Sequence, residues 1–179
     1  LRNSQVLKQS ELARDAKLNV MTTMRYLSLM ETSFILFRLP PHLRNRSSRL
    51  IKSPKIYLSD TGLACYLAGV KKIDASEPLR GAIWENYVIQ NLQSILSAHY
   101  PDDRITYWNI QGRYEVDFIL EMERETIAIE VKNGSRWQKA DLIGLRNYLE
   151  STKDCRAGFL VYNGKETLKV ADKIWVVPA

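Results

Sequence analysis

The chain has 179 residues, 45% of them hydrophobic and 26% charged, a balance typical of a globular protein with one large domain or two small ones. Its net charge is +6, no apolar run approaches the roughly 20 residues that span a bilayer, and no secretory signal pattern opens the sequence. Two cysteines without a CxxC spacing argue against a zinc site and predict a reducing, cytoplasmic compartment.

The positive charge is concentrated in the first part of the chain. Residues 1–73 contain 13 Lys/Arg against 4 Asp/Glu, a balance of +9, whereas residues 74–179 have a balance of −3. The stretch RLPPHLRNRSSRLIKSPK, residues 38–55, contains six basic residues and no acidic one. Such asymmetry predicts a surface for a polyanion, and a solvated basic loop is the alternative interpretation.

The first elements in chain order are two helices followed by two strands. A short helix is expected near Ser10, and Asn19 is a suitable N-cap for a second helix. The apolar stripe of this second helix is formed by Val20, Met24, Leu27 and Met30. Strands are expected at residues 34–39 and 55–58. Helix, turn, helix and β-hairpin is the order of a winged helix-turn-helix domain.

A winged helix of this kind predicts which side chains would contact DNA. Thr22, Thr23 and Arg25 are expected to face outward from the second helix, and Arg44, Arg46 and Arg49 to lie on the wing. The alternative keeps the fold but uses it for protein–protein packing, because winged helices serve both purposes.

A boundary follows this first part of the chain. Asp60 is expected to cap a helix at residues 61–68 that Gly69 ends, and the charged stretch VKKIDASEPLRG then resembles a linker. We therefore predict two domains, residues 1–73 and 74–179. In the second domain, helices are expected at residues 83–96 and 137–149, and strands at 105–110, 115–120, 127–132, 157–163 and 173–179. Their order predicts an α/β fold with a mixed sheet.

The hairpin EVDFILEMERETIAIEVK, residues 115–132, carries the most unusual pattern. Alternation places Val116, Phe118 and Leu120 on one face of the first strand, and Ile127, Ile129 and Val131 on one face of the second. Asp117 then falls opposite its apolar neighbours, as do Glu130 and Lys132. Charges in a half-buried place are unfavourable unless they neutralise one another or hold a metal ion.

These residues are similar to the D…(D/E)xK motif of the restriction-endonuclease-like nuclease superfamily, also written PD-(D/E)xK, to which Holliday-junction resolvases belong. Asp117 is followed after twelve residues by Glu130-Val131-Lys132. Many members add an acid from the first helix of the core, and Glu85 in GAIWENYVIQNL occupies that place in chain order. The resemblance implies a restriction-endonuclease-like core preceded by the winged helix.

The chain as a whole resembles the C-terminal domain of unknown function of prokaryotic AAA-type ATP-binding proteins. The segments KSPKIYLSDTGL, WEN and EVDFIL…IAIEVK carry this resemblance. It implies an ATPase domain that precedes a winged helix and a nuclease-like module. No GxxxxGK[ST] motif occurs here and the first residue is Leu, so we expect any ATP-binding domain to lie upstream.

The nuclease resemblance implies metal-assisted phosphodiester hydrolysis. Asp117, Glu130, Glu85 and the carbonyl of Val131 would hold Mg²⁺ or Mn²⁺, which prefer hard oxygen ligands. Lys132 would stabilise the transition state or help deprotonate the nucleophile. The catalytic set is therefore Asp117, Glu130, Lys132 and Glu85.

Other residues have weaker roles, and other functions stay open. Arg113 and Lys139 are candidates for phosphate contacts, whereas His42 and His99 are isolated in loop-like surroundings and are not expected to be ligands. The acids and lysine of the hairpin are alternatively an ion-pair network. Three hypotheses remain: a metal-dependent nuclease of DNA, an inactive nuclease-like fold that binds nucleic acid, and a protein-interaction module.

Overall fold

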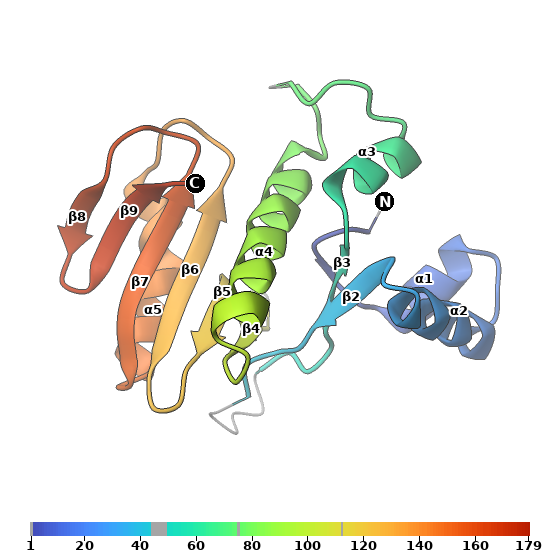
Figure 1. The fold of residues 1–179 in the computed structure, drawn as a ribbon, viewed down its shortest axis with the longest axis horizontal. Coiled ribbons are helices and arrows are strands. Elements are labelled where there is room, and N and C mark those ends of the chain that lie inside the picture. Colours follow the sequence, from blue (N-terminus) through green and yellow to red (C-terminus); the bar gives the residue numbers. More distant parts are fainter. Residues whose placement is uncertain (1, 44–49, 75, 112) are drawn as a thin grey trace.

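A six-stranded mixed sheet forms the larger layer of the molecule in a computed structural model that describes residues 2–43, 50–74, 76–111 and 113–179 (Figure 1). The strand order is β4-β5-β6-β7-β9-β8. The strands are β4 (Arg104–Ile110), β5 (Tyr114–Glu121), β6 (Thr126–Lys132), β7 (Cys155–Tyr162), β8 (Leu168–Ala171) and β9 (Ile174–Pro178). β6, β7 and β9 run parallel, and the remaining pairs are antiparallel, which confirms the predicted mixed sheet.

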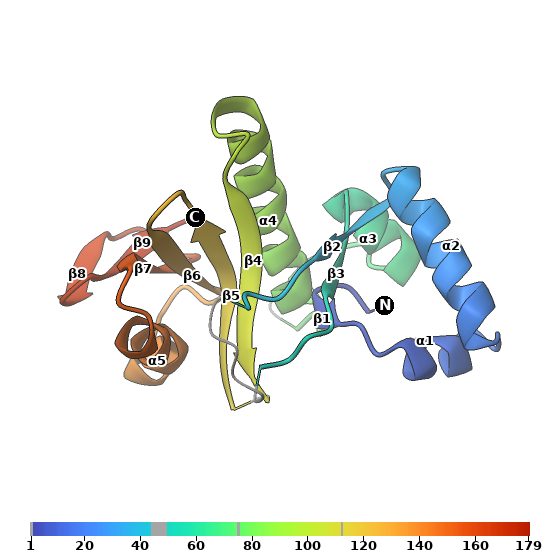
Figure 2. The same cartoon turned by 90° about the horizontal axis from the view of Figure 1, so that it is seen from below.

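Two helices cover opposite faces of this sheet (Figure 2). α4 (Arg80–His99) packs on one face with a core that includes Ile89, Tyr107 and Phe118. A 3-10 turn (Lys139–Leu142) followed by α5 (Ile143–Ser151) covers the other face, where Leu145 and Tyr148 are fully buried. None of the helices in the described part of the chain has both the length and the hydropathy required to cross a membrane.

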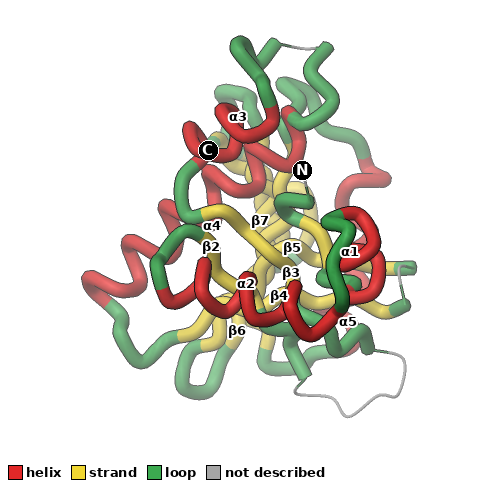
Figure 3. The backbone as a smooth tube through the Cα atoms, turned by 90° about the vertical axis from the view of Figure 1, so that its right-hand side faces the viewer, coloured by secondary structure: helices red, strands yellow, loops and turns green. Residues whose placement is uncertain are grey.

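The N-terminal part is a small three-stranded sheet with three helices (Figure 3). Its strand order is β1-β3-β2, and both pairs are antiparallel. The elements are β1 (Gln5–Val6), α1 (Gln9–Asp15), α2 (Val20–Thr32), β2 (Leu36–Leu39), β3 (Lys55–Leu58) and α3 (Thr61–Ala68). β3 is the central strand and pairs with β1 on one edge and with β2 on the other. All four of its residues are buried.

Local capping signals account for the helix ends that the sequence predicts here. The Asn19 side chain accepts a hydrogen bond from the Thr22 N–H at the start of α2. Asp60 accepts one from the Leu63 N–H at the start of α3, and Gly69 ends that helix in the left-handed conformation with φ of 70°. The predicted caps are confirmed at all three positions.

Some boundaries differ from the predictions. Phe34 has a positive φ of 57° and lies in the turn before β2, so the strand begins two residues later than expected. The helix predicted at residues 137–149 is divided into the 3-10 turn and α5. The short strands β1 and β8 were missed, because two and four residues carry little periodicity.

The N-terminal sheet packs directly on α4 and on the larger sheet. Leu39 and Tyr57, from β2 and β3, belong to the same buried cluster as Ile89 and Phe118. The chain after β2 also pairs with β4, through a bridge between Pro41 and Tyr107. The two parts of the chain therefore share one hydrophobic core, and the predicted division at residue 73 stays a prediction.

Candidate functional site

The six-stranded sheet opens between β5 and β6. Their pairing runs from Glu121 opposite Thr126 only as far as Phe118 opposite Ile129. Beyond this point β5 stays paired with β4, and β6 stays paired with β7 as far as Lys132. The ends of β5 and β6 that do not pair with each other carry the charged residues of the hairpin. Those side chains therefore lie together at the opening.

A bulge in β5 determines which way Asp117 points. Thr106 pairs with Ile119 and Trp108 with Val116, so two residues of β5 oppose a single residue of β4. As a result, Val116 packs in the cluster under α5, whereas Phe118 and Leu120 pack in the cluster under α4. The prediction that Val116 shares a face with Phe118 and Leu120 is therefore wrong. The corresponding prediction for Ile127, Ile129 and Val131 is confirmed.

Asp117 joins the two separated strands. Its Oδ2 accepts a hydrogen bond of 2.9 Å from the Val131 N–H on β6, in place of a main-chain partner. Its Oδ1 lies 3.2 Å from the Nζ of Lys55, which comes from β3 of the N-terminal sheet. The carboxylate is thus fixed between three strands.

Lys55, which the sequence analysis did not single out, lies at the centre of the charged residues. Its side chain is 3% exposed, and its Nζ lies 3.1 Å from Glu85 Oε1 and 2.5 Å from Glu115 Oε1, besides its contact with Asp117. Burial opposes the charged form, but Glu85, Asp117 and Glu115 hold the pKa of Lys55 well above its usual value. Two sequence signals were its place in the segment KSPKIYLSDTGL, which carries the family resemblance, and its position in the strand KIYL, but the surrounding basic run obscured both.

Glu85 reaches the opening from the first turns of α4. Its Oε1 accepts hydrogen bonds from Lys55 Nζ and, at 2.5 Å, from the hydroxyl of Tyr57. Burial, followed by the nearby charge of Asp117, raises the pKa of Glu85 to about 7. Glu85, the predicted third acid, therefore lies beside the hairpin motif, but it is bonded to the N-terminal sheet.

Glu130 and Lys132 form a second pair at the end of β6. Lys132 Nζ lies 3.0 Å from Glu130 Oε1, and the side chain of Lys132 is 37% exposed. Glu130 Oε2 is buried without a hydrogen-bond partner among the described residues. Burial, followed by the charge of Asp117, raises the pKa of Glu130 well above its usual range. An unpartnered buried carboxylate oxygen is unfavourable unless a cation or a water molecule binds to it.

These side chains line a single cavity of about 490 Å³. All four predicted acid and lysine positions contribute, together with one missed acid. The lining is Gly81, Glu85, Glu115, Asp117, Glu130, Val131, Lys132 and Asn133. We call this cavity the acidic pocket. Arg113 and Lys139, the predicted phosphate contacts, are exposed and are not among its lining residues.

The acidic pocket fits a hard divalent cation only in part. Among the described residues, no three or more His, Cys, Asp or Glu side chains are grouped so as to hold a metal ion, and Lys55 lies between three of the four carboxylates. Two features favour a cation: Glu130 has a free buried oxygen, and four carboxylates are balanced by only two ammonium groups among the described residues. The carboxylate with a free buried oxygen for a metal ion is therefore Glu130, whereas Lys55 engages Glu85, Glu115 and Asp117.

The predicted DNA-contacting residues of the N-terminal part have three different outcomes. Arg25 is exposed and Thr22 is partly exposed on α2. Thr23 is 4% exposed and its hydroxyl donates to the Asn19 carbonyl, so the prediction that it faces outward is wrong. Arg44, Arg46 and Arg49 lie outside the described residues. Thr23 lies four residues before buried Leu27, and this spacing places both on the inner face of the helix.

The outer face of α2 is more apolar than a DNA-contacting helix requires. Met21 is 66% exposed, Tyr26 53% and Leu29 61%. Val20, which the sequence placed in the buried stripe, is 41% exposed. Exposed apolar patches of this kind are typical of surfaces that bind other proteins.

His42 is neither isolated nor in a solvated loop, contrary to the prediction. It is 4% exposed, and its Nδ1 lies 2.7 Å from Glu121 Oε1 while its Nε2 lies 3.2 Å from the Tyr148 hydroxyl. The His42 N–H also donates to the Tyr107 carbonyl on β4. These bonds attach the segment after β2 to the larger sheet, and they lie away from the acidic pocket.

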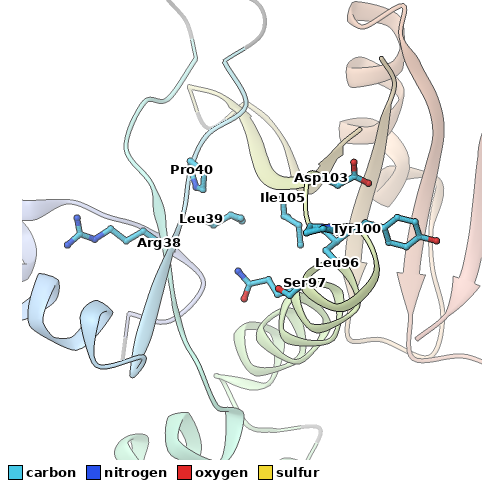
Figure 4. A pocket seen from close by; sticks show the side chains of 10 residues that line it. Arg38, Leu39, Pro40, Leu96, Ser97, Tyr100, Asp103 and Ile105 are labelled. Carbon is cyan, nitrogen blue, oxygen red and sulfur yellow. The ribbon is translucent and has the colours of Figure 1, made fainter. Parts of the chain in front are cut away.

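A second cavity, of about 200 Å³, lies toward the other end of α4 (Figure 4). Arg38, Leu39 and Pro40 line it from the N-terminal part. Leu96, Ser97 and Tyr100 line it from the end of α4, and Asp103 and Ile105 from the start of β4. Its lining comes from both parts of the chain and contains no cluster of acids or nucleophiles.

Comparisons with known proteins match the chain in two parts. Residues 80–179 match the family model DUF4143, described as a domain of unknown function, and residues 1–74 match DUF8612, also described as a domain of unknown function. The chain is similar to Uncharacterized protein Rv2008c of Mycobacterium tuberculosis and Uncharacterized protein Mb2031c of Mycobacterium bovis, at 30% identity each. Both alignments cover 99% of this chain and 39% of the relative, so the chain spans less than half the length of these curated relatives.

Proposed function

Since this chain belongs to the DUF4143 family of domains of unknown function, we propose its function from the acidic pocket: a nuclease-like module that hydrolyses DNA phosphodiesters with a divalent metal ion. The observation that carries the proposal is the convergence of Asp117, Glu130, Lys132 and Glu85 on one cavity at the sheet opening. Four residues spread over 48 positions of sequence meet there, with a free buried oxygen on Glu130.

The architecture supports the same proposal at the level of the fold. We infer that the mixed sheet, with α4 and α5 on opposite faces, is a restriction-endonuclease-like core. We infer likewise that α1, α2 and the β1-β3-β2 sheet form a winged helix-turn-helix domain. Fold alone does not determine activity, so the proposal depends on the pocket.

In this proposal, different residues of the acidic pocket bind the metal ion and the phosphate. Asp117 and Glu130 would hold Mg²⁺ or Mn²⁺, with the carbonyl of Val131 as a further hard ligand. A bound ion supplies positive charge beside the scissile phosphate and lowers the pKa of a water molecule. Burial opposes the charged form of Lys132, but Glu130 raises its pKa, so Lys132 stays protonated and donates hydrogen bonds to a phosphate oxygen.

The partners follow from the charge of the chain and from the family resemblance. We propose that the +9 of residues 1–73 contacts the phosphate backbone of DNA, with Arg25 on α2 as a described contact residue. We further propose that the module works beside an AAA-type ATPase domain. The curated relatives are longer than this chain, which leaves room in them for such a domain.

Two observations favour a second candidate function, a protein-interaction module with an inactive nuclease-like core. The outer face of α2 exposes Met21, Tyr26 and Leu29, and Lys55 already neutralises part of the acidic pocket. In that case the pocket is an internal ion-pair network, and α2 binds another protein.

The experiment combines calorimetric titration of Mn²⁺ with cleavage of branched and linear DNA. Wild type is expected to bind the ion and to cut DNA only when metal is present. Asp117→Asn and Glu130→Gln should each lose at least about 100-fold in cleavage, because even outer partners of metal ligands change affinity or activity by about 10- to 100-fold.

The matched control is Glu123→Gln, which removes a carboxylate from the exposed turn between β5 and β6 and should leave binding and cleavage unchanged. Absence of metal binding in wild type would reject the nuclease proposal. Binding of DNA without cleavage, unaffected by Asp117→Asn, would favour the second candidate.

A further inference from the structure

Lys55 is surrounded by carboxylates in the way that a metal ion would be. Its Nζ lies 3.1 Å from Glu85 Oε1, 3.2 Å from Asp117 Oδ1 and 2.5 Å from Glu115 Oε1. An ammonium group has three N–H donors, and here its nitrogen donates to Glu85 and Asp117 and forms an ion pair with Glu115. With 3% of its side chain exposed, Lys55 makes these contacts with almost no access to solvent.

The position of Lys55 is fixed by a different part of the chain from the acids it contacts. β3 pairs with β2 on one edge and with β1 on the other, with Lys55 opposite Leu39 and Val6. Lys55 and Tyr57 share the face toward α4, whereas Ile56 and Leu58 pack into the core of the N-terminal part. The backbone of Lys55 is therefore held in the central strand of that sheet, from which its side chain reaches the acids.

The charges of the acidic pocket then divide into two groups. Lys55 holds Glu85, Glu115 and Asp117, and Lys132 holds Glu130. When all six groups are ionised the pocket carries a charge of −2, which a single divalent cation neutralises. The free oxygen for that cation is Glu130 Oε2, which belongs to the one carboxylate of the four without a contact to Lys55 among the described residues.

We propose that Lys55 occupies a cation position of the acidic pocket: its ammonium stands where Glu85, Glu115 and Asp117 would otherwise hold a second metal ion. The pocket therefore binds one divalent ion and not a pair. This inference rests on the proposed function in placing a metal ion next to Lys55. In this assignment Lys55 is a positioning residue that fixes the acids, and the N-terminal part of the chain contributes it.

The test counts the ions bound by each protein. Wild type and Lys55→Met are dialysed to equilibrium against Mn²⁺, and bound metal is measured by elemental analysis; methionine keeps the unbranched stem of the side chain without the charged amine. The variant is expected to bind one more ion per chain than wild type. Lys55→Arg keeps the charge and should bind the same number as wild type.

Lys132→Met is the matched control, because Lys132 pairs with the single carboxylate of Glu130. It should not add an ion, whereas a general effect of removing a pocket lysine would add one in both variants. Equal counts for wild type and Lys55→Met would overturn the inference. A gain of one ion in Lys132→Met would overturn it as well.

The outcome separates this inference from the proposed function. If wild type binds no ion but Lys55→Met binds one, the nuclease proposal fails and the role of Lys55 stands. If Lys55→Met is unfolded in the presence of chelator, Mn²⁺ should restore its circular dichroism, because a ligand that binds only the folded state stabilises it. An unfolded variant that Mn²⁺ does not restore would contradict the inference.

Discussion

Glu85 is the residue through which the two parts of the chain meet at the acidic pocket. It belongs to α4, yet its Oε1 accepts hydrogen bonds from Lys55 and Tyr57 of the N-terminal sheet. Burial, more than the neighbouring charge of Asp117, determines its ionisation. Its pKa of about 7 lies above the usual value because of burial and of Asp117. The protonation of a carboxyl group between the two parts therefore changes near neutral pH.

This shift predicts that stability falls as pH rises. A folded-state pKa above the unfolded value means that the folded chain binds more protons between pH values of about 4.5 and about 7, so the unfolding free energy decreases across that window. Glu85 should account for a loss on the order of 2–3 kcal/mol. Urea unfolding at pH 5 and pH 8 measures the loss, and Glu85→Gln should reduce it. An unchanged pH dependence in Glu85→Gln would assign the loss to other groups, with Glu130 the first candidate.

At the scale of single residues, the sequence predicted where the acids of the pocket lie, but it did not predict the lysine that contacts three of them. Asp117, Glu130, Lys132 and Glu85 do line one cavity, because motif spacing on adjacent strands restricts where they can lie. Lys55 was not predicted, since its contacts with the acids depend on how β3 packs against α4. The three arginines of the basic run at 44–49 lie outside the described residues.

At the scale of elements, Gly144 allows α5 to approach β5 closely. A Cβ at this position would lie 2.0 Å from the Glu115 carbonyl oxygen, a distance that no real contact allows. Glu115 is one of the three acids around Lys55, so this helix–strand contact supports the wall of the acidic pocket. The glycine is required for packing and not for a positive φ, which Gly69 alone among the described glycines has.

Gly144→Ala should therefore destabilise the protein by about 1–3 kcal/mol, because α5 must shift away from β5 to relieve the clash. This loss should appear although alanine is the better helix former by about 1 kcal/mol. Chemical denaturation measures the change. The matched control is Gly81→Ala in α4, where the nearest atom to an added Cβ is Asn133 Nδ2 at 3.7 Å. Equal stabilities for the two variants would mean that the approach of α5 is not tight.

The elements themselves were largely predictable from the sequence, and their irregularities were not. Alternating apolar residues predicted β5 and β6 to within one residue at each end, and side-chain caps predicted the starts of α2 and α3. The bulge in β5 could not be predicted, because it arises from pairing with β4 and leaves no local signature in residues 115–120. Its effect was to reverse the predicted side of Val116.

At the scale of the whole molecule, one buried cluster connects the two parts of the chain. Leu39 and Tyr57 from the N-terminal sheet pack with Ile89, Tyr107 and Phe118 of the larger sheet and its helix. The sequence predicted a boundary at residue 73 because the linker is polar and aperiodic, which reports on local composition only. Contacts between β3 and α4 bring together residues about 30 positions apart, and local composition cannot predict such contacts.

The shared core predicts that both parts unfold together. Tyr57→Ala removes a fully buried side chain and should cost about 3–5 kcal/mol. Hydrogen exchange should then show the same loss of protection in peptides from α2 and from β7. Tyr66→Ala, at a side chain that is 81% exposed on α3, should leave both unchanged. Loss of protection confined to α2 would instead indicate two domains that fold independently.

The opening between β5 and β6 has an evolutionary consequence. Glu115, Glu130 and Lys132 lie beyond the last paired residues, Phe118 and Ile129, so the register of the hairpin does not depend on which side chains they carry, whereas Asp117 bonds across the opening to the Val131 N–H. Substitutions at these three positions can therefore change the charge of the pocket while the hairpin pairing is kept. A lineage with this fold can change the charge and the donor atoms of the pocket one residue at a time, with the strand pairing of the hairpin retained throughout.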